Sequence, residues 1–255
     1  MDAGFKSPLI DFFKRGDVAR DVRLVAAQGA LTPRVHEQLA LLVMLVADPD
    51  PEVAAAADAT LRIIPRGSLA AFLARSDVSQ DLLAFFARRG IEPSAQPLED
   101  VDAPIIDTAQ GPEIPDDEDT EQSALQRLAA MSVPQKMSRA TKGTREERAI
   151  LIRDPNKIVA VAVMSSPKLT EAEVEAIAKM SSVSDEILRI VAHNRNWMKS
   201  YAIVSALVKN PKMPLALSMN LINRLNDKDM RMLSTNRNVP EVLRTTARKK
   251  IVFDK

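Results

Sequence analysis

The sequence predicts an all-α protein, in which stacked helix pairs form an α-solenoid beside a smaller N-terminal helical unit. Only 7 of the 255 residues are glycine and 4% are aromatic, which disfavours a turn-rich β-architecture. One tetrapeptide recurs in the second half, and its closing asparagines are 40 and 42 residues apart. A period of about 40 residues is typical of helical-repeat arrays. The three copies are Arg153-Asp154-Pro155-Asn156, His193-Asn194-Arg195-Asn196 and Thr235-Asn236-Arg237-Asn238.

A second turn motif recurs between these copies. The run Ser165-Ser166-Pro167-Lys168 returns as Lys209-Asn210-Pro211-Lys212, 44 residues later, and an amphipathic segment follows each run. We therefore expect each repeat to hold two helices and two turns. Repeats of this kind bury their apolar faces by stacking on their neighbours.

Helix boundaries are clearly marked in the first 98 residues. Ser7-Pro8, Thr32-Pro33 and Asp50-Pro51 each place a capping side chain before a proline at the first helical position. Gly29 is expected to follow the end of a helix, because glycine readily adopts the left-handed conformation found there.

Two capping boxes predict helix starts in the second half. Thr144 and Thr170 are each followed three residues later by a glutamate, so that hydroxyl and carboxylate can satisfy exposed amides reciprocally. The closing asparagines of the recurring tetrapeptide, Asn156, Asn196 and Asn238, are expected to cap helices in the same region.

Charge divides the chain into three blocks. Residues 1–98 carry 11 Lys and Arg against 12 Asp and Glu, residues 99–121 carry none against 10, and residues 122–255 carry 24 against 12. The middle block reads as a disordered acidic linker between two folded units, an N-terminal helical unit and a basic repeat unit. The surplus of positive charge in the third block favours an anionic partner.

The repeated turns, from about Gly143 to Ile251, resemble those of HEAT-like α-solenoids and of uncharacterised bacterial repeat proteins. The stretch Asp48–Val53, followed by alanines, also resembles the turn and second-helix opening of a HEAT repeat. The resemblance implies a right-handed or gently curved stack that binds macromolecules. It implies no reaction and brings no active-site residues.

The candidate partner-binding residues are the basic and aromatic side chains at the repeated turns. Arg153, Arg195 and Arg237 occupy equivalent positions, so stacking would place them in a row suited to phosphates or carboxylates. Alternatively, such arginines bridge neighbouring turns. Trp197, the only tryptophan, either anchors a partner or fills a helix interface. The full set is Arg153, Lys157, Arg195, Trp197, Lys199, Lys209, Lys212 and Arg237.

No catalytic, cofactor-binding or metal-binding residue is predicted. The chain has no cysteine, and its two histidines, His36 and His193, are far apart in the sequence. A Gly-rich phosphate loop, a paired-histidine metal motif and a nucleophile elbow are all missing from it. DNA glycosylases built from helical repeats are a remote alternative, since the aromatic residues of the basic block are almost confined to Trp197 and Tyr201.

The sequence gives no sign of a membrane segment. Its first residues lack a basic region followed by an unbroken apolar stretch, and the longest apolar run, Leu39–Ala47, is too short to cross a bilayer. We therefore expect a cytoplasmic protein.

These observations lead us to expect a non-catalytic scaffold or adaptor, whose basic helical-repeat surface binds an acidic partner, in the first place a protein. The alternative is a nucleic-acid-binding α-solenoid, in which the same surface follows the phosphate backbone. That alternative predicts an affinity that falls steeply as salt rises.

Overall fold

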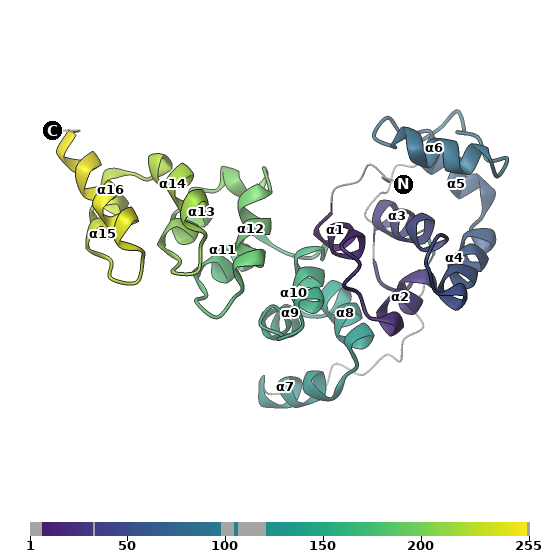
Figure 1. The fold of residues 1–255 in the computed structure, drawn as a ribbon, viewed down its shortest axis with the longest axis horizontal. Helices are drawn as coiled ribbons and strands as arrows, with labels where there is room; N and C mark the ends of the chain where they lie inside the picture. Colours follow the sequence, from purple (N-terminus) through teal and green to yellow (C-terminus); the bar gives the residue numbers. More distant parts are fainter. Residues whose placement is uncertain (1–6, 33, 98–104, 107–120, 254–255) are drawn as a thin grey trace. The chain divides into compact units, whose positions relative to one another are not determined.

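All regular secondary structure in the described part of the chain is helical. The computed structural model describes residues 7–32, 34–97, 105–106 and 121–253. Over these ranges it contains sixteen α-helices, two short 3-10 helices and no β-strand (Figure 1). The predicted all-α class is confirmed.

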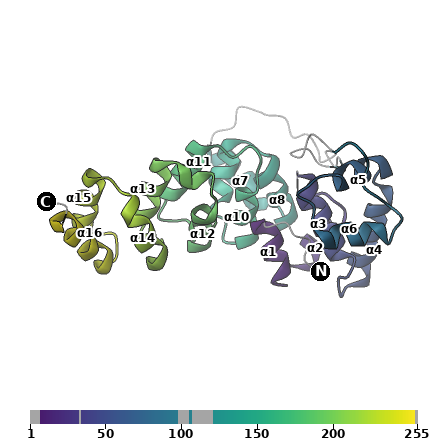
Figure 2. The same cartoon turned by 90° about the horizontal axis from the view of Figure 1, so that it is seen from above.

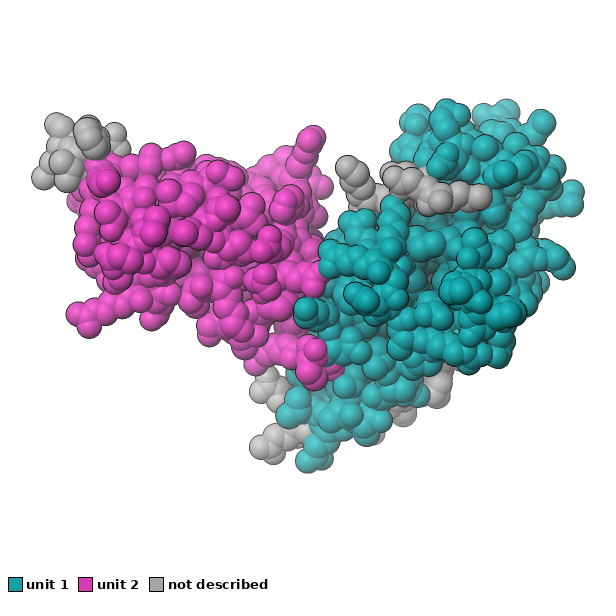
Figure 3. Space-filling model, viewed as in Figure 1, with its two compact units in different colours: residues 1–151, 156–168 teal, residues 152–155, 169–255 magenta. Residues whose placement is uncertain are grey.

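The helices group into two compact units, coloured separately in Figure 3. Unit 1 comprises residues 1–151 and 156–168, and unit 2 comprises residues 152–155 and 169–255. Each unit is described by itself below.

Unit 1 combines six helices from the N-terminal block with four that follow the acidic segment. The helices are α1 (Pro8–Lys14), α2 (Arg20–Ala27), α3 (Val35–Leu45), α4 (Pro51–Ile63), α5 (Arg66–Leu73), α6 (Gln80–Ala87), α7 (Glu121–Ala130), α8 (Val133–Lys142), α9 (Arg145–Leu151) and α10 (Lys157–Met164). The central helix is α3, which contacts α1, α2, α4 and α6. Its apolar side chains are almost all buried, in agreement with the apolar run in the sequence.

The boundary of unit 1 that the helix contacts define differs from the boundary that the charge distribution suggests. The charge blocks place a boundary at residues 98 and 122, whereas in the structure α8 packs against α2 and α10 packs against α1. These contacts join segments more than 100 residues apart, and no local pattern announces them. The predicted linker, residues 99–121, lies outside the described residues except for Ile105, Ile106 and the first residue of α7.

The predicted helix starts at Pro8 and Pro51 both form, but only the second is capped by a side chain. Helix α1 begins at Pro8, where the Ser7 hydroxyl makes no capping hydrogen bond, contrary to the prediction, and α4 begins at Pro51, where the Asp50 carboxylate accepts hydrogen bonds from the amides of Glu52 and Val53. Gly29 follows α2 with a φ of 77°, the left-handed conformation expected after a helix end. The expected start at Thr32-Pro33 involves Pro33, which lies outside the described residues, and α3 begins at Val35.

Unit 2 contains the last six α-helices and both 3-10 helices. They are α11 (Glu171–Lys179), α12 (Asp185–His193), η1 (Trp197–Lys199), α13 (Tyr201–Lys209), α14 (Leu215–Leu221), η2 (Ile222–Arg224), α15 (Asp227–Thr235) and α16 (Glu241–Phe253). Helix α13 packs on α11, and α15 lies beside α16 in both ribbon views (Figures 1 and 2). Buried side chains from α13, α15 and α16, including Val208, Leu233 and Leu243, share one apolar cluster.

Each repeat period holds three α-helices rather than the expected pair. Helices α10, α11 and α12 lie between Asn156 and Asn196, and helices α13, α14 and α15 lie between Asn196 and Asn238. The period of the turn motif fixes the length of the repeat, but it does not fix how many helices share that length.

Both predicted capping boxes form. The Glu147 carboxylate accepts a hydrogen bond from the Thr144 amide at 2.9 Å, and the Thr144 hydroxyl accepts one from the Glu147 amide at 3.3 Å. Thr170 and Glu173 repeat this arrangement at 3.0 and 3.3 Å. Helices α9 and α11 begin directly after these threonines, as predicted.

Which asparagine of the recurring turn bonds to the backbone differs from the prediction. Asn156 caps α10 by accepting a hydrogen bond from the Ile158 amide. In the later copies the first asparagine acts instead: Asn194 accepts from the amides of Asn196 and Trp197, and Asn236 accepts from the amide of Asn238. These are Asx turns, in which an asparagine side chain bonds to the backbone two residues on. The predictions that Asn196 and Asn238 cap helices are wrong, because the Asn196 side chain makes no capping bond and α16 begins only at Glu241, three residues after Asn238.

The second turn motif makes an equivalent contact in each unit. In unit 1 the Ser166 hydroxyl donates to the carbonyl of Thr141, near the end of α8, at 2.8 Å. In unit 2 the Asn210 amide donates to the carbonyls of Ala178 and Met180, at the end of α11, at 2.7 and 3.0 Å. Both side chains are buried, so each turn closes the end of a helix that precedes its own repeat period, α8 for Ser166 and α11 for Asn210.

Candidate partner-binding surface of unit 2

The predicted partner-binding residues are mostly at the surface. Trp197 and Lys209 are half-buried, and the other six are exposed. Lys209 forms an ion pair with Asp229, and the ammonium of Lys212 donates to the carbonyl of Ser182 at 3.3 Å. The six exposed residues are Arg153, Lys157, Arg195, Lys199, Lys212 and Arg237.

Three of the predicted residues lie together on the turn that contains η1. Asn194 builds this turn, since its side chain accepts two hydrogen bonds from the backbone and its carbonyl accepts a third from the Met198 amide at 3.0 Å. The turn carries the side chains of Arg195, Trp197 and Lys199.

The fold brings a further cation to this turn. Arg224, at the end of η2, donates from its guanidinium to the carbonyl of Met198 at 2.5 Å. We call Arg195, Trp197, Lys199 and Arg224 the basic turn. Arg224 lies 26 residues from Met198 in the sequence, and no turn motif marks it, so the sequence gives no signal for its position.

The three cations of the basic turn are not balanced by acidic side chains. Within the described residues, no carboxylate lies within 4.0 Å of the charged nitrogens of Arg195, Lys199 or Arg224. By contrast, the exposed Arg20 of unit 1 pairs with both Asp50 and Glu52. The positive charge of the basic turn is therefore available to an anionic ligand.

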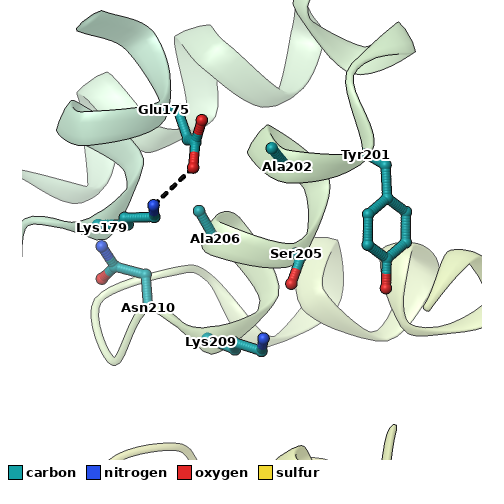
Figure 4. A pocket seen from close by; sticks show the side chains of 8 residues that line it. All are labelled: Glu175, Lys179, Tyr201, Ala202, Ser205, Ala206, Lys209 and Asn210. Carbon is teal, nitrogen blue, oxygen red and sulfur yellow. Dashed lines mark hydrogen bonds and ion pairs between the residues drawn. The ribbon is translucent and has the colours of Figure 1, made fainter. Parts of the chain in front are cut away.

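A pocket of about 410 Å³ lies next to the basic turn, between α11 and α13 (Figure 4). Ala202 and Ala206 of α13 provide small apolar side chains along it. Glu175 and Lys179 of α11 line it as an ion pair at 2.5 Å, and Figure 4 shows their charged groups facing each other. Tyr201, the first residue of α13, lines the pocket and follows the basic turn after one intervening residue.

A hydrogen-bonded network centred on Asp229 borders the pocket. The carboxylate of Asp229 accepts from the ammonium of Lys209 at 2.7 Å, from the hydroxyl of Ser205 at 3.2 Å, and from the hydroxyl of Tyr201. Asp229 belongs to α15 and its three donors belong to α13. The network therefore fastens the first turn of α15 to α13.

Tyr201 also completes the cap of α15. The Asn226 side chain accepts from the Asp229 amide at 2.8 Å, which is half of a capping box. Asp229 does not close the other half, because its carboxylate faces the donors of α13. The Tyr201 hydroxyl accepts from the Asn226 amide at 3.1 Å instead. A tyrosine of α13 thus caps α15, two helices later in the same repeat period.

The electrostatics of this network oppose acid–base chemistry. Lys209 and Tyr201 hold the pKa of Asp229 below its usual range. Partial burial and the neighbouring carboxylate raise the pKa of Tyr201 above its ordinary value. Effective acid–base catalysis needs a pKa near the working pH, and both groups are shifted away from neutrality. The network holds the two helices together and prepares no nucleophile.

The described residues show neither a metal cluster nor a membrane span. Within them, no three His, Asp or Glu side chains are close enough to hold a metal ion, and no helix is both long and apolar enough to cross a bilayer. His193 lies in the last turn of α12, where its Nδ1 contacts the carbonyl of Arg189 at 2.7 Å. Comparison with protein-family models, curated proteins and solved structures finds no match to the chain.

Proposed function

We propose that this chain is a non-catalytic interaction protein, and that the basic turn of unit 2 binds an acidic segment of a partner protein. One observation carries the proposal: Arg195 and Lys199 flank a half-buried tryptophan on one turn, Arg224 of η2 bonds to the backbone of that turn, and none of the three cations pairs with a carboxylate of the described residues. Arginine and tryptophan are the side chains that most often dominate the energy of protein interfaces. Two guanidinium groups and an ammonium group complement carboxylates, and the indole supplies an apolar anchor.

The surroundings of the basic turn favour a peptide-like ligand. Unit 2 carries 16 Lys and Arg against 10 Asp and Glu, so its field attracts acidic segments. The adjoining pocket begins at Tyr201, and its alanines leave room for a small or aliphatic side chain. A chain that places carboxylates on the basic turn can therefore continue along α13 into this pocket.

We further propose that the helices stack as a HEAT-like solenoid. The repeat length of about 40 residues, with two or three helices in each repeat, is typical of such arrays. The equivalent contacts of Ser166 and Asn210 support this arrangement, since each closes the corresponding helix end in its own unit.

Nucleic-acid binding is the alternative that the exposed arginines favour. Arg153, Arg195 and Arg237 are all exposed and recur at the repeat period, as contacts along a phosphate backbone require. The two ligands differ in their salt dependence, because nucleic-acid affinity falls with the number of counterions released. A peptide that also buries apolar side chains retains more of its affinity at high salt.

The test measures binding of the full-length chain by fluorescence anisotropy over a salt series. The probes are a short labelled peptide rich in Asp and Glu with one central leucine, the same peptide with lysine at each acidic position, and a short DNA duplex. We expect the acidic peptide to bind and the lysine peptide not to bind. Tight, steeply salt-dependent binding of the duplex alone would replace the proposal with the nucleic-acid alternative.

Reversing the charge of basic residues tests whether the acidic peptide binds at the basic turn. The variant Arg195→Glu/Lys199→Glu changes the basic turn, and the control Lys228→Glu/Arg231→Glu makes the same change of charge on exposed residues of α15. We expect the first variant to weaken binding by about a hundredfold, at roughly tenfold for each lost contact, and the control to change it little. Equal losses in both variants would show a response to net charge and would refute the assigned site.

A further inference from the structure

Two residues of the acidic segment are held on unit 1 by a buried glutamine. Gln38 of α3 is only 2% exposed. Its carboxamide oxygen accepts hydrogen bonds from the amides of Ile105 and Ile106, each at 3.1 Å. Its nitrogen donates to the carbonyl of Ile106 at 3.2 Å and to that of Gly29 at 2.6 Å.

Gln38 forms hydrogen bonds with the backbone of Ile105 and Ile106 and none with their side chains. Both the N–H and the C=O of Ile106 are paired with one carboxamide, and the N–H of Ile105 shares its oxygen, so two successive amides point the same way and the backbone bends here. A peptide with any side chains can form these three bonds if its backbone bends in the same way. They therefore supply affinity for a backbone conformation, while selectivity must come from the side chains.

The side chain of Ile106 lies beside Gly29 and Thr60. A Cβ atom added to Gly29 would lie 3.5 Å from the Cδ1 atom of Ile106 and 3.5 Å from the Cγ2 atom of Thr60. Ile106 and the methyl group of Thr60 therefore both border the space beside Gly29, at ordinary contact distance from where a side chain would begin. Ile105 and Ile106 are themselves partly buried.

The hydrogen bonds of Gln38 favour the state in which Ile105 and Ile106 are bound to it. A glutamine side chain has two donor hydrogens and an oxygen that accepts two bonds, and all four are used here. Three of the four partners belong to Ile105 and Ile106. Departure of the segment would exchange these three bonds for bonds to water, and a hydrogen bond within the protein contributes a small net stability over that exchange.

We propose that Gln38, Gly29 and Thr60 form a binding site for a peptide whose backbone bends at two adjacent branched aliphatic residues, and that Ile105–Ile106 is its tethered ligand. A partner segment of the same chemistry binds there when it displaces the tethered one. Because a short tether supplies an effective concentration in the millimolar range, the segment in cis outcompetes a free peptide at ordinary concentrations. This site lies on unit 1 and is independent of the basic turn of unit 2.

Amide hydrogen exchange of the full-length chain tests the docking. We expect the amides of Ile105 and Ile106 to be protected, and Gln38→Met to remove that protection, since methionine fills a similar volume without the hydrogen bonds. Gln28→Met is the matched control, because Gln28 is an exposed glutamine one residue from Gly29. Unprotected isoleucine amides in the unaltered chain, or equal effects of the two substitutions, would overturn the proposal.

A peptide added in trans tests the recognition. Ile105→Asp/Ile106→Asp empties the site without altering Gln38, so this full-length variant should bind a labelled peptide with the sequence of residues 101–110. We expect at least about tenfold weaker binding to the unaltered chain, because its own segment competes. A peptide with aspartate at both isoleucine positions should not bind. Failure of the parent peptide to bind the emptied, folded variant, or equal binding of both peptides, would refute the site.

Discussion

Replacing Asp229 by alanine tests whether the network between α13 and α15 stabilises unit 2. The substitution removes the acceptor of Lys209, Ser205 and Tyr201 at once. A shielded hydrogen bond to a charged group contributes about 1.5–3 kcal/mol. The side chains of Lys209 and Asp229 are 28% and 15% exposed, so water replaces part of what is lost. We therefore expect Asp229→Ala to lower the free energy of unfolding by about 2 kcal/mol.

Asp227→Ala is the matched control for this substitution. Asp227 also lies in the first turn of α15, where a carboxylate interacts favourably with the helix dipole, but its side chain is exposed. Its removal should cost about 0.5 kcal/mol. Urea denaturation followed by Trp197 fluorescence suits the comparison, because the only tryptophan of the chain reports on unit 2. A difference below about 0.5 kcal/mol between the two variants would refute the stabilising role of the network.

The pH dependence gives a second check on the same network. Lys209 and Tyr201 lower the pKa of Asp229, so the folded protein releases this proton more readily than the unfolded chain does. The stabilisation is then present above the ordinary aspartate pKa and is lost as the pH falls through the lowered value. We expect the difference between Asp229→Ala and the unaltered chain to shrink in acid. A constant difference across the acid range would contradict this assignment.

Three further substitutions probe the fold. Burial raises the pKa of Glu37, so the folded protein loses stability as the pH rises from the ordinary glutamate pKa towards the raised value. Glu37→Gln should therefore stabilise the protein at neutral pH and leave its stability unchanged well below the ordinary glutamate pKa. Thermal unfolding at several pH values checks the direction of this change. Asn210→Ala should lower the free energy of unfolding, measured by urea denaturation, by about 2–3 kcal/mol, since it leaves the carbonyls at the end of α11 without their donor. The exposed control Asn196→Ala should change it by no more than about 0.5 kcal/mol. Asp50→Ala removes the cap of α4, which should lower the free energy of unfolding by about 1 kcal/mol and so lower the melting temperature. A melting temperature equal to that of the unaltered chain would show that the cap is not needed.

Helix starts were predictable because their chemistry is local. Thr144 with Glu147, and Thr170 with Glu173, satisfy amides within three residues, so spacing alone identifies them. Asn196 was predicted wrongly for a local reason as well. Asn194 stands two residues earlier and already accepts the amides of the turn, which leaves Asn196 outside the cap.

The grouping of helices depends on contacts between distant segments. Charge and composition change at residue 99, but α10 packs on α1 and therefore belongs to unit 1. No periodicity in either helix specifies that partner. The number of helices per repeat was missed for a related reason, since a repeat length of about 40 residues accommodates either two or three helices.

The candidate surface was predictable in part. Arg195, Trp197 and Lys199 are neighbours in the sequence, and the structure places all three on one turn. Arg224 and Asp229 come from later elements, so their contacts with this region follow from tertiary packing alone. Lys209 matched the basic pattern, but its charge is already balanced by Asp229.

The most direct test of the proposed function follows the emission of Trp197 while the full-length chain is titrated with the acidic peptide. Because Trp197 is the only tryptophan, a change in its emission locates the ligand at the basic turn. The account predicts a saturable shift whose midpoint rises by about a hundredfold in Arg195→Glu/Lys199→Glu and stays nearly constant in Lys228→Glu/Arg231→Glu. Peptide binding detected by anisotropy with unchanged Trp197 emission, or equal midpoints in the two variants, would contradict it.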